Sequence, residues 1–287
     1  MSTTDPEPHA LALPALARLI LRSNLFVALG VVSLTAYAGW FAGYNPTLEL
    51  LVVGTGTLLV YNLDHLRDDL RRTRTGAGRP RLNISLRWIL VVLSAAGLAA
   101  SFAQTPPVVF WTAVPSGALG LLYGAPIGGR RLKDIPGAKA WIVSIAVSWA
   151  VVAIPLAMRD GVWVLRPDLF AFVVALTALN AHAFDLRDVE IDRASGAWTW
   201  ASRLGPEAAR ARLIAAAALA TVGTGVWRIA ERGSELSFIG HGWEIPLTFA
   251  AVTAALVLTR RGVPRPAYGL LFDGLLFLPA VWAIVFS

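Results

Sequence analysis

Long apolar stretches alternate with short polar segments along nearly the whole chain. Spanning a bilayer takes about 20 mostly apolar residues in a helix. That template predicts nine transmembrane helices, at 16–43, 46–67, 87–104, 107–124, 138–158, 166–185, 208–229, 244–260 and 267–286. No long polar segment is left over for a soluble domain. We therefore expect an all-α membrane protein with a single domain over 1–287, in which residues 1–13 form a disordered tail.

Composition supports this class. Of the 287 residues, 56% are hydrophobic and only 15% are charged, whereas soluble domains average about 25% charged residues. The chain has no cysteine, which excludes a disulfide framework, a thiolate metal site and a thiol nucleophile. The N-terminus MSTTDPEPHA has no basic region followed by a cleavage site, so we expect no removable signal peptide.

The basic residues predict the orientation in the membrane. Most arginines and both lysines fall in segments 67–87, 125–139, 187–212 and 260–265, whereas the connections near residues 44, 105 and 160 are nearly uncharged. Basic loops stay in the cytoplasm, so we expect a multi-pass protein of a bacterial or archaeal inner membrane with a cytoplasmic N-terminus. The net charge of +7 does not indicate nucleic-acid binding, because the arginines are dispersed over short loops.

Two acidic clusters end apolar helices on this predicted cytoplasmic side. Asp64 and Asp68 are four residues apart, and Asp185, Asp188 and Asp192 follow at i, i+3 and i+7, so each set is expected on one helix face. A carboxylate at membrane depth costs about 2.5–3.5 kcal/mol. Positive charge is therefore expected between the clusters, which converge on one cavity.

Carboxylate ligands without cysteine favour a hard cation such as Mg²⁺, which fills its other positions with water and phosphate oxygens. Arginine and lysine side chains nearby suit phosphate; the candidates are Arg71, Arg72, Arg79, Arg131 and Lys133. The combination predicts a site for Mg²⁺ and a diphosphate carried on a lipid tail. For either cluster alone, a solvated helix end is an equal alternative.

Three segments carry a resemblance to a known family. DLRDVEIDRASGAWTWASRLG resembles the second Asp-rich motif of the UbiA superfamily of intramembrane prenyltransferases. LLYGAPIGGRRLKDIPGAKAWIVSIAVSWA is similar to that family's central loop and following helix, and RPRL at 79–82 matches the Arg-Pro that follows its first motif. The first motif departs from the family pattern N-D-x-x-D-x-x-x-D, with Val60 and Tyr61 in place of Asn and Asp. Asn62 or Asp69 is a possible substitute, which leaves the number of Mg²⁺ ions open.

The resemblance implies a nine-helix bundle with a central cavity open to lipid. It further implies that Mg²⁺ bridges both Asp motifs to a prenyl diphosphate, the diphosphate leaves, and a hydrophobic acceptor, aromatic or lipid-like, attacks the allylic cation. Aromatic faces stabilise cations, and the chain has 11 Trp, 12 Phe and 5 Tyr. The expected partners are prenyl diphosphate, the acceptor and membrane lipid. The acceptor, the prenyl length and the oligomeric state are left open.

Individual residues receive the following roles. The predicted metal ligands are Asp64, Asp68, Asp188 and Asp192, while Asp185 either binds metal or accepts a hydrogen bond from a basic residue. The predicted substrate-binding residues are Asn62, Arg72, Arg79, Tyr123, Arg131, Lys133 and Asn180.

Plainer roles compete with these. The basic residues could be topology signals, the reading we favour for Arg130 and Lys139. Hydrogen bonding between helices is the alternative for both asparagines, and an interfacial position is the alternative for Tyr123. His65 and His182 are expected to make polar contacts, and Glu190 to be solvated. Asp273 is an intramembrane acid, either functional or part of an ion pair.

Two other functions remain open. A membrane terpene cyclase would use the same site without an acceptor. An ion-coupled transporter is disfavoured, because transporters place such charges near the midplane on broken helices.

Overall fold

The computed structural model describes residues 14–75, 82–125, 131–163, 165–195, 198–232, 242–259 and 263–286. Every regular element in these ranges is helical, and each of the nine predicted segments falls on a helix, which confirms the all-α fold class. The elements are α1 Ala15–Arg22, α2 Leu25–Phe41, α3 Leu48–Thr75, α4 Ile84–Phe102, α5 Pro107–Gly124, η1 Leu132–Asp134, α6 Ala138–Asp160, α7 Pro167–Arg187, α8 Val189–Ser195, α9 Trp200–Leu204, α10 Pro206–Arg232, α11 Glu244–Leu258, α12 Arg265–Gly274, η2 Leu275–Phe277 and α13 Leu278–Phe286.

The first predicted helix is in fact two helices. α1 and α2 meet at an angle of 66°, and Asn24 between them adopts a left-handed conformation with φ 63°. Asparagine tolerates this conformation better than most residues with a side chain. Because the apolar pattern continues through the bend, the hydropathy pattern did not reveal it.

Six described helical segments are long and apolar enough to cross a membrane, and the bent α1–α2 pair would make a seventh. α11 is apolar but only 15 residues long. α3 has 28 residues, but charged side chains fill its second half. The chain is thus built as a multi-pass membrane protein, and the count of nine spans stays a prediction, as does the central cavity.

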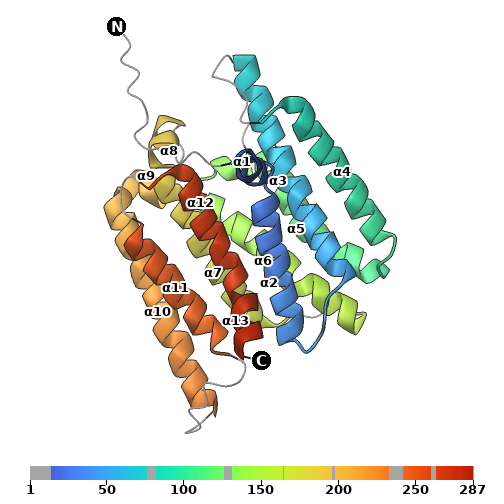
Figure 1. Cartoon of the computed structure of the whole chain (residues 1–287), viewed down its shortest axis with the longest axis vertical. Coiled ribbons are helices and arrows are strands. Elements are labelled where there is room, and N and C mark those ends of the chain that lie inside the picture. The colour runs from blue at the N-terminus through green and yellow to red at the C-terminus, as the bar shows by residue number, and fades with distance from the viewer. Residues whose placement is uncertain are drawn as a thin grey trace.

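α6 and α7 lie at the centre of the bundle. Half of the apolar window of α6 and 61% of that of α7 are buried, against 17–22% for α4, α5 and α10, whose remaining surface suits lipid. α3 packs against α2, α4 and α5, while α10 packs against α11. In Figure 1, α8, α9 and the C-terminal end of α3 lie at one end of the bundle and the C-terminus lies at the other.

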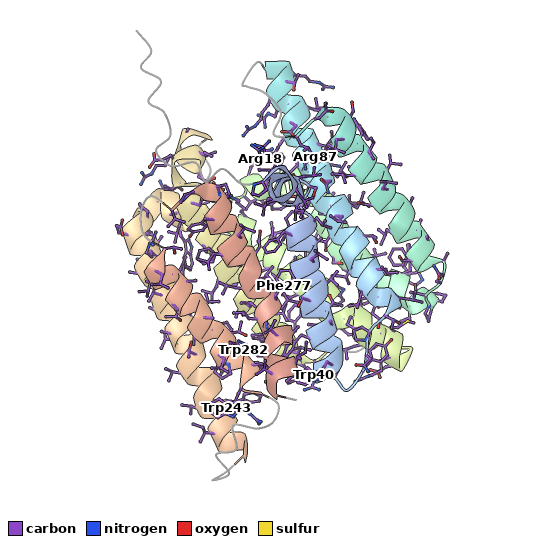
Figure 2. The ribbon with its side chains drawn as sticks, viewed as in Figure 1. Arg18, Trp40, Arg87, Trp243, Phe277 and Trp282 are labelled. Carbon is purple, nitrogen blue, oxygen red and sulfur yellow. The ribbon has the colours of Figure 1, made fainter. Side chains whose placement is uncertain are left out.

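Tryptophans lie at both ends of the bundle, and Trp200 begins α9 at the end where α8 lies. Figure 2 shows Arg18 and Arg87 at the end where α1 lies, and Trp40, Trp243 and Trp282 toward the opposite end. Tryptophan is typical of membrane interfaces. The charged end is the one that bears both acidic clusters.

A buried polar cluster fixes the charged half of α3. Arg87 of α4 is 1% exposed; its Nη1 donates to Asn62 Oδ1 at 2.9 Å, and its Nη2 lies 3.6 Å from Asp69 Oδ2. The Asn62 amide in turn donates to the carbonyl oxygen of Ser23, at the α1–α2 bend, at 3.0 Å. These bonds tie α3 and α4 to the bend and so orient the acidic residues that follow.

Candidate active site

Two of the three aspartates of α3, Asp64 and Asp68, converge on one ammonium group. Lys133 Nζ lies 2.8 Å from Asp64 Oδ1 and 3.0 Å from Asp68 Oδ2. The Asp side chains meet it together because they are one helical turn apart. Arg131 adds a second cation, with its Nη1 3.1 Å from Asp68 Oδ1. A single positive centre therefore bridges two carboxylates from one helix face.

In the second acidic cluster, a lysine again lies between two aspartates. Lys139 Nζ lies 2.9 Å from Asp185 Oδ1 and 3.8 Å from Asp192 Oδ1, and both aspartates are buried. His182 Nδ1 lies 3.6 Å from Asp185 Oδ2, and its ring stacks on Trp200 with centroids 4.5 Å apart. Neither ring nitrogen of His182 has a hydrogen-bond partner among the described residues, so the hydrogen-bonded contact expected for this residue is not observed.

Lys133 lies in η1, between α5 and α6, and Lys139 lies in the first turn of α6; they are the only lysines in the chain. Gly137, between them, has φ 72°, and a Cβ there would overlap the ring of Trp198. Its N–H also donates to the Trp198 carbonyl oxygen at 3.2 Å. This backbone packing holds the start of α6 against the segment after α8, so that Lys133 before α6 and Lys139 in its first turn each reach one acidic cluster.

Lys139, which was expected only as a topology signal, also makes specific ion pairs. Its ammonium pairs with Asp185 and Asp192, and it supplies the positive charge that the buried carboxylates require. The scarcity of lysine in the sequence could have indicated this role. In a chain rich in arginine, the only two lysines lie beside the two acidic clusters.

The expectation that Asp185, Asp188 and Asp192 share one helix face was also wrong. α7 ends at Arg187, and α8 begins only at Val189. Asp188 lies at the break with φ −100° and ψ 12°, and Arg187 clamps it through two hydrogen bonds of 2.9 and 2.6 Å. The break turns Asp188 toward Arg187, whereas Asp185 and Asp192 meet at Lys139.

Tyr123 and Gly124 of α5 line the first cluster. Lys133 Nζ lies 5.7 Å from the centre of the Tyr123 ring, a cation–π arrangement. Gly124 is in such close contact with Asp64 that a Cβ would overlap the carboxylate. Arg72 is half-buried one turn after Asp68 on α3, while Arg79 and Arg130 lie outside the described residues.

The structure does not bring Asn62 or Asp69 to this cluster. Asn62 is fully buried and makes four side-chain hydrogen bonds, two through its oxygen and two through its amide nitrogen. Asp69 pairs with Arg87. Asn180 lies five residues before Asp185 on α7, and its amide oxygen is buried without a hydrogen-bond partner among the described residues. Among the other candidates, His65 contacts Asn24 at 3.2 Å, and Glu190 has an 80% exposed side chain, as expected.

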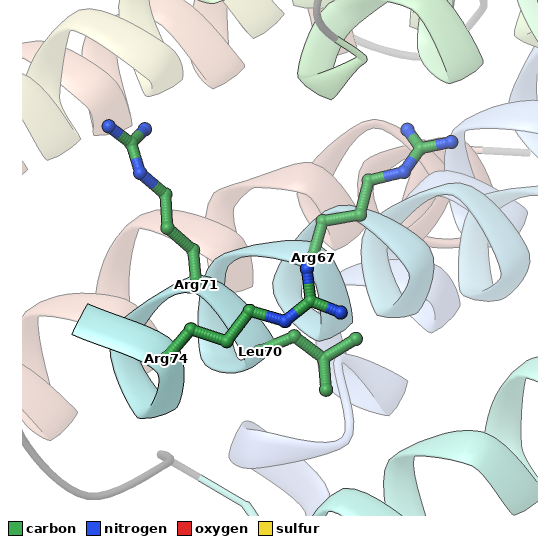
Figure 3. Close-up of a pocket in the computed structure, with 4 residues that line it drawn as sticks. All are labelled: Arg67, Leu70, Arg71 and Arg74. Carbon is green, nitrogen blue, oxygen red and sulfur yellow. The ribbon is translucent and has the colours of Figure 1, made fainter. Parts of the chain in front are cut away.

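Basic side chains on α3 continue beside the first cluster. Arg67, Leu70, Arg71 and Arg74 line a cavity of about 320 Å³ (Figure 3). The Arg67 guanidinium is held by the Leu121 carbonyl oxygen of α5 at 2.9 Å. Three guanidinium groups on one stretch of helix give this end of the bundle a field that favours anions.

The ion pairs outside the membrane-spanning helices shift pKa values. Hydrogen bonds from Arg131 lower the pKa of Asp134 below its ordinary value, and the same contact raises the pKa of Arg131. Burial raises the pKa of Asp192, an effect that the nearby Lys139 opposes. The loop arginine thus stays charged beside Asp68.

The donor set fits a hard cation. Among the described residues, no group of three His, Cys, Asp or Glu side chains forms a ready-made metal site. The carboxylates instead come in two pairs, each drawn together by an ammonium group. Lys133 shows that one cation reaches oxygens of both Asp64 and Asp68 at 3.0 Å or less, and all-oxygen donors suit Mg²⁺.

A family model and several solved structures match most of this chain. The model of the UbiA prenyltransferase family matches residues 61–284. A comparison with curated proteins finds no match.

Solved archaeal structures share the fold. The apo structure of a UbiA homolog from Aeropyrum pernix K1 aligns with a TM-score of 0.66 and 15% identity, covering 90% of this chain and 97% of that one. A UbiA homolog from Archaeoglobus fulgidus bound to GPP and Mg²⁺ aligns at 0.60 with 16% identity, covering 94% and 98%. The same homolog bound to DMAPP and Mg²⁺ aligns at 0.57 with 17% identity, covering 94% and 100%.

Proposed function

The chain belongs to the UbiA prenyltransferase family, and from that premise we propose that it is an Mg²⁺-dependent intramembrane prenyltransferase. It would move an isoprenyl group from a prenyl diphosphate to an aromatic or lipid-like acceptor. One observation carries the proposal: two carboxylate pairs from different helices lie at one end of an apolar bundle, and each pair is bridged by one lysine, Lys133 before α6 or Lys139 in its first turn.

The aspartates are the groups that would hold Mg²⁺. Asp64 and Asp68 would bind it on the α3 side; Asp188 and Asp192, with Asp185 as a further oxygen donor, would bind it on the α7–α8 side. The bound ion supplies positive charge that stabilises a departing diphosphate. Support comes from the Archaeoglobus homolog, whose structures contain GPP or DMAPP together with Mg²⁺.

Basic residues would bind the diphosphate itself. Lys133 and Arg131 already lie at the first carboxylate pair, so a small movement would turn their N–H groups toward phosphate oxygens. Arg72 and Arg79 are further diphosphate candidates on the same side. Positive groups held in place before the reaction stabilise charge on the leaving group without reorganisation of solvent.

The prenyl chain would enter the apolar interior. The bond between its first carbon and the diphosphate oxygen breaks, and the allylic cation is captured by the acceptor. Tyr123, whose ring already faces an ammonium group, is placed to stabilise that positive charge. The apolar surroundings exclude water, which would otherwise capture the cation.

We assign the charged end to the cytoplasm, together with the N-terminus. The assignment is supported by the gathering of arginines and both lysines at the end that carries the acidic clusters, as the positive-inside rule requires. Asp185 and Asp192 lie near the junction of α7 and α8, and Asp64 and Asp68 lie in the charged second half of α3. This placement at one end of the bundle favours an enzyme over an ion-coupled transporter.

The test is diphosphate release from purified protein in detergent, with prenyl diphosphates from dimethylallyl to geranylgeranyl, with and without acceptors. We expect release that requires Mg²⁺ and is abolished in Asp64→Ala and Asp188→Ala. Asp168→Asn, which alters an acid at the far end of α7, is the matched control. Absence of release with every donor contradicts the proposal, and release without acceptor that yields a hydrocarbon identifies a cyclase instead.

A further inference from the structure

The first helix crosses the charged end of the bundle. α1 meets α2 at an angle of 66°, and in Figure 1 it is seen nearly end-on, whereas α2 runs along the bundle. Helices that span a bilayer are tilted from the membrane normal by about 20° on average. If α2 has a tilt near that average, α1 lies closer to the membrane plane than to its normal.

Buried hydrogen bonds fix the level at which α1 leaves the bundle. Arg87 lies in the first turn of α4, and its Nη1 donates to the carbonyl oxygen of Arg22 at 3.1 Å. The next carbonyl oxygen, that of Ser23, accepts from Asn62 Nδ2 at 3.0 Å. Since α4 is long and apolar enough to cross a membrane, α1 lies level with the first turn of a membrane-length helix. That level is the boundary between lipid tails and headgroups.

α1 presents three different sides. Its partly buried apolar side packs against α2 and α12. On its outer surface, the side chains of Leu16 and Leu19 are 68% and 44% exposed. Arg18 and Arg22 are also exposed, one turn apart on the neighbouring side of the helix. A leucine edge therefore runs beside an arginine edge on the part of α1 that the bundle does not cover.

The charge of this surface is not neutralised by the protein. No ion pair among the described residues involves the guanidinium group of Arg18 or Arg22, and the sequence contains no acidic residue between Glu7 and Glu49. Helices with an apolar edge and a basic edge lie in the membrane interface, with the apolar side chains at the boundary of the acyl chains. Arginine side chains at this level extend toward lipid phosphates, to which they donate in pairs.

We infer that α1 is an interfacial helix that binds the phosphate groups of anionic phospholipids. Leu16 and Leu19 enter the acyl boundary, and Arg18 and Arg22 contact the headgroups. The inference is independent of the proposed prenyltransferase function, because it uses no residue of the two acidic clusters. The bend after Arg22 is hydrogen-bonded to α3 and α4, so lipid bound to α1 also stabilises the start of the bundle.

The first experiment measures the depth of α1 in a bilayer. Because the chain has no cysteine, Leu16→Cys and Leu19→Cys are each labelled with an NBD fluorophore in the full-length protein and reconstituted into vesicles. Leu93→Cys is the control, since residue 93 lies in the middle of α4 with a 63% exposed side chain. Quenching is compared for lipids that carry a doxyl group on the fifth or on the twelfth acyl carbon.

We expect the shallow doxyl group to quench the labels at 16 and 19 about twice as strongly as the deep one, because interfacial helices insert only about 5–10 Å. The label at 93 should show the opposite preference. Quenching of both α1 labels by aqueous iodide alone would place α1 in water. Stronger quenching by the deep group at residue 16 would make α1 part of a membrane span. Either result overturns the inference.

The second experiment tests the anionic headgroup. Dioctanoyl phosphatidylglycerol, dioctanoyl phosphatidylcholine and inorganic phosphate are titrated into the detergent-solubilised protein, and the label at residue 19 reports binding locally. Arg18→Gln/Arg22→Gln is compared with Arg203→Gln/Arg212→Gln, which removes two exposed arginines of α9 and α10 and changes the net charge equally. Each arginine of α1 should contribute about fivefold to the affinity for phosphatidylglycerol, the effect of one basic residue at an anionic lipid surface.

The affinity for phosphatidylglycerol should therefore fall roughly 25-fold in Arg18→Gln/Arg22→Gln and stay unchanged in the control pair. Arg18→Lys/Arg22→Lys keeps both charges and should retain most of the affinity, which separates charge from any loss of folding in the glutamine variant. Equal affinities for the two lipids, or equal losses in the two glutamine variants, would refute an anionic-lipid site on α1. The same response to inorganic phosphate would show a site for a free anion instead.

Discussion

Lys133 lies 2.8 Å from Asp64 and closes the first pair of aspartates that the sequence marks as metal ligands. The ammonium group and a metal ion would compete for the same oxygens. Lys139 repeats this arrangement at Asp185. The two lysines therefore hold the carboxylates together, and binding of Mg²⁺ requires them to move.

Removal of Lys133 should make the protein depend more on Mg²⁺ for stability. In Lys133→Ala, Asp64 and Asp68 lose their shared partner, and we expect a loss of about 1–3 kcal/mol in metal-free buffer. Because an ion that binds only the folded state stabilises it, the Mg²⁺-induced rise in Tm should exceed that of the wild type. Scanning fluorimetry with EDTA and with Mg²⁺ measures both effects.

Arg166→Ala is the control for Lys133→Ala, because it breaks a surface pair with Asp168 in which both side chains are about 40% exposed. Such pairs contribute little, so its Tm should match the wild type with and without Mg²⁺. An identical Mg²⁺ response in Lys133→Ala and the wild type would show that Asp64 and Asp68 do not take up the ion.

Gly124 should tolerate no side chain. The Cβ of Gly124→Ala would overlap the Asp64 carboxylate and displace it, and a misplacement of about 1 Å at a reacting centre can reduce a rate roughly 100-fold. We expect diphosphate release to fall by about 10–100-fold while the protein stays folded. Gly117→Ala on the same helix meets nothing within 4 Å and should be as active as the wild type. Equal rates in both variants would contradict the packing of α5 against Asp64.

The Arg87–Asp69 pair should be required for folding rather than for chemistry. Arg87→Leu leaves Asp69 buried without this cation, and breaking such a pair typically costs about 3–5 kcal/mol. The double variant Arg87→Leu/Asp69→Leu should recover part of that loss, because it removes the uncompensated acid as well. The Tm values of Arg87→Leu, Asp69→Leu and the double variant form a double-mutant cycle with the wild type. A double variant that is no more stable than Arg87→Leu would argue against a buried ion pair.

The orientation can be tested by labelling, because the chain contains no cysteine. Thr73→Cys lies at the charged end on an exposed position of α3, and Val162→Cys lies in the connection after α6, where the side chain is 58% exposed. In intact cells, a membrane-impermeant maleimide should label residue 162 and reach residue 73 only after permeabilisation. The reverse pattern would place the acidic clusters outside.

Much of the architecture could be predicted because apolar length is a local property. The segment 107–124 was predicted with the bounds that α5 has, and 138–158 is extended by only two residues in α6. The bend at Asn24 and the break at Asp188 were missed, because a change in backbone dihedral angles leaves the hydropathy pattern unchanged.

The candidate site was predicted only in part. The spacing of Asp64 and Asp68 revealed their common face, since one turn of α3 contains both. The same reasoning failed for Asp188, whose position depends on where α7 ends. The residues around Asn62 in the sequence do not show whether its side chain is hydrogen-bonded inside the bundle or lies at the candidate active site. Its four hydrogen-bond partners come from the preceding turn of α3, the α1–α2 bend and α4.

By itself the sequence determined the helices, the acidic motifs and the family resemblance, because each is written in residues that are near one another along the chain. Tertiary structure alone decided which charges meet. Lys133 and Asp64 are separated by 69 residues, and Lys139 and Asp185 by 46. In a medium of low dielectric constant a buried carboxylate needs a counter-charge in direct contact, and only the packing of α3, α6 and α7 brings Lys133 and Lys139 to the two acidic clusters.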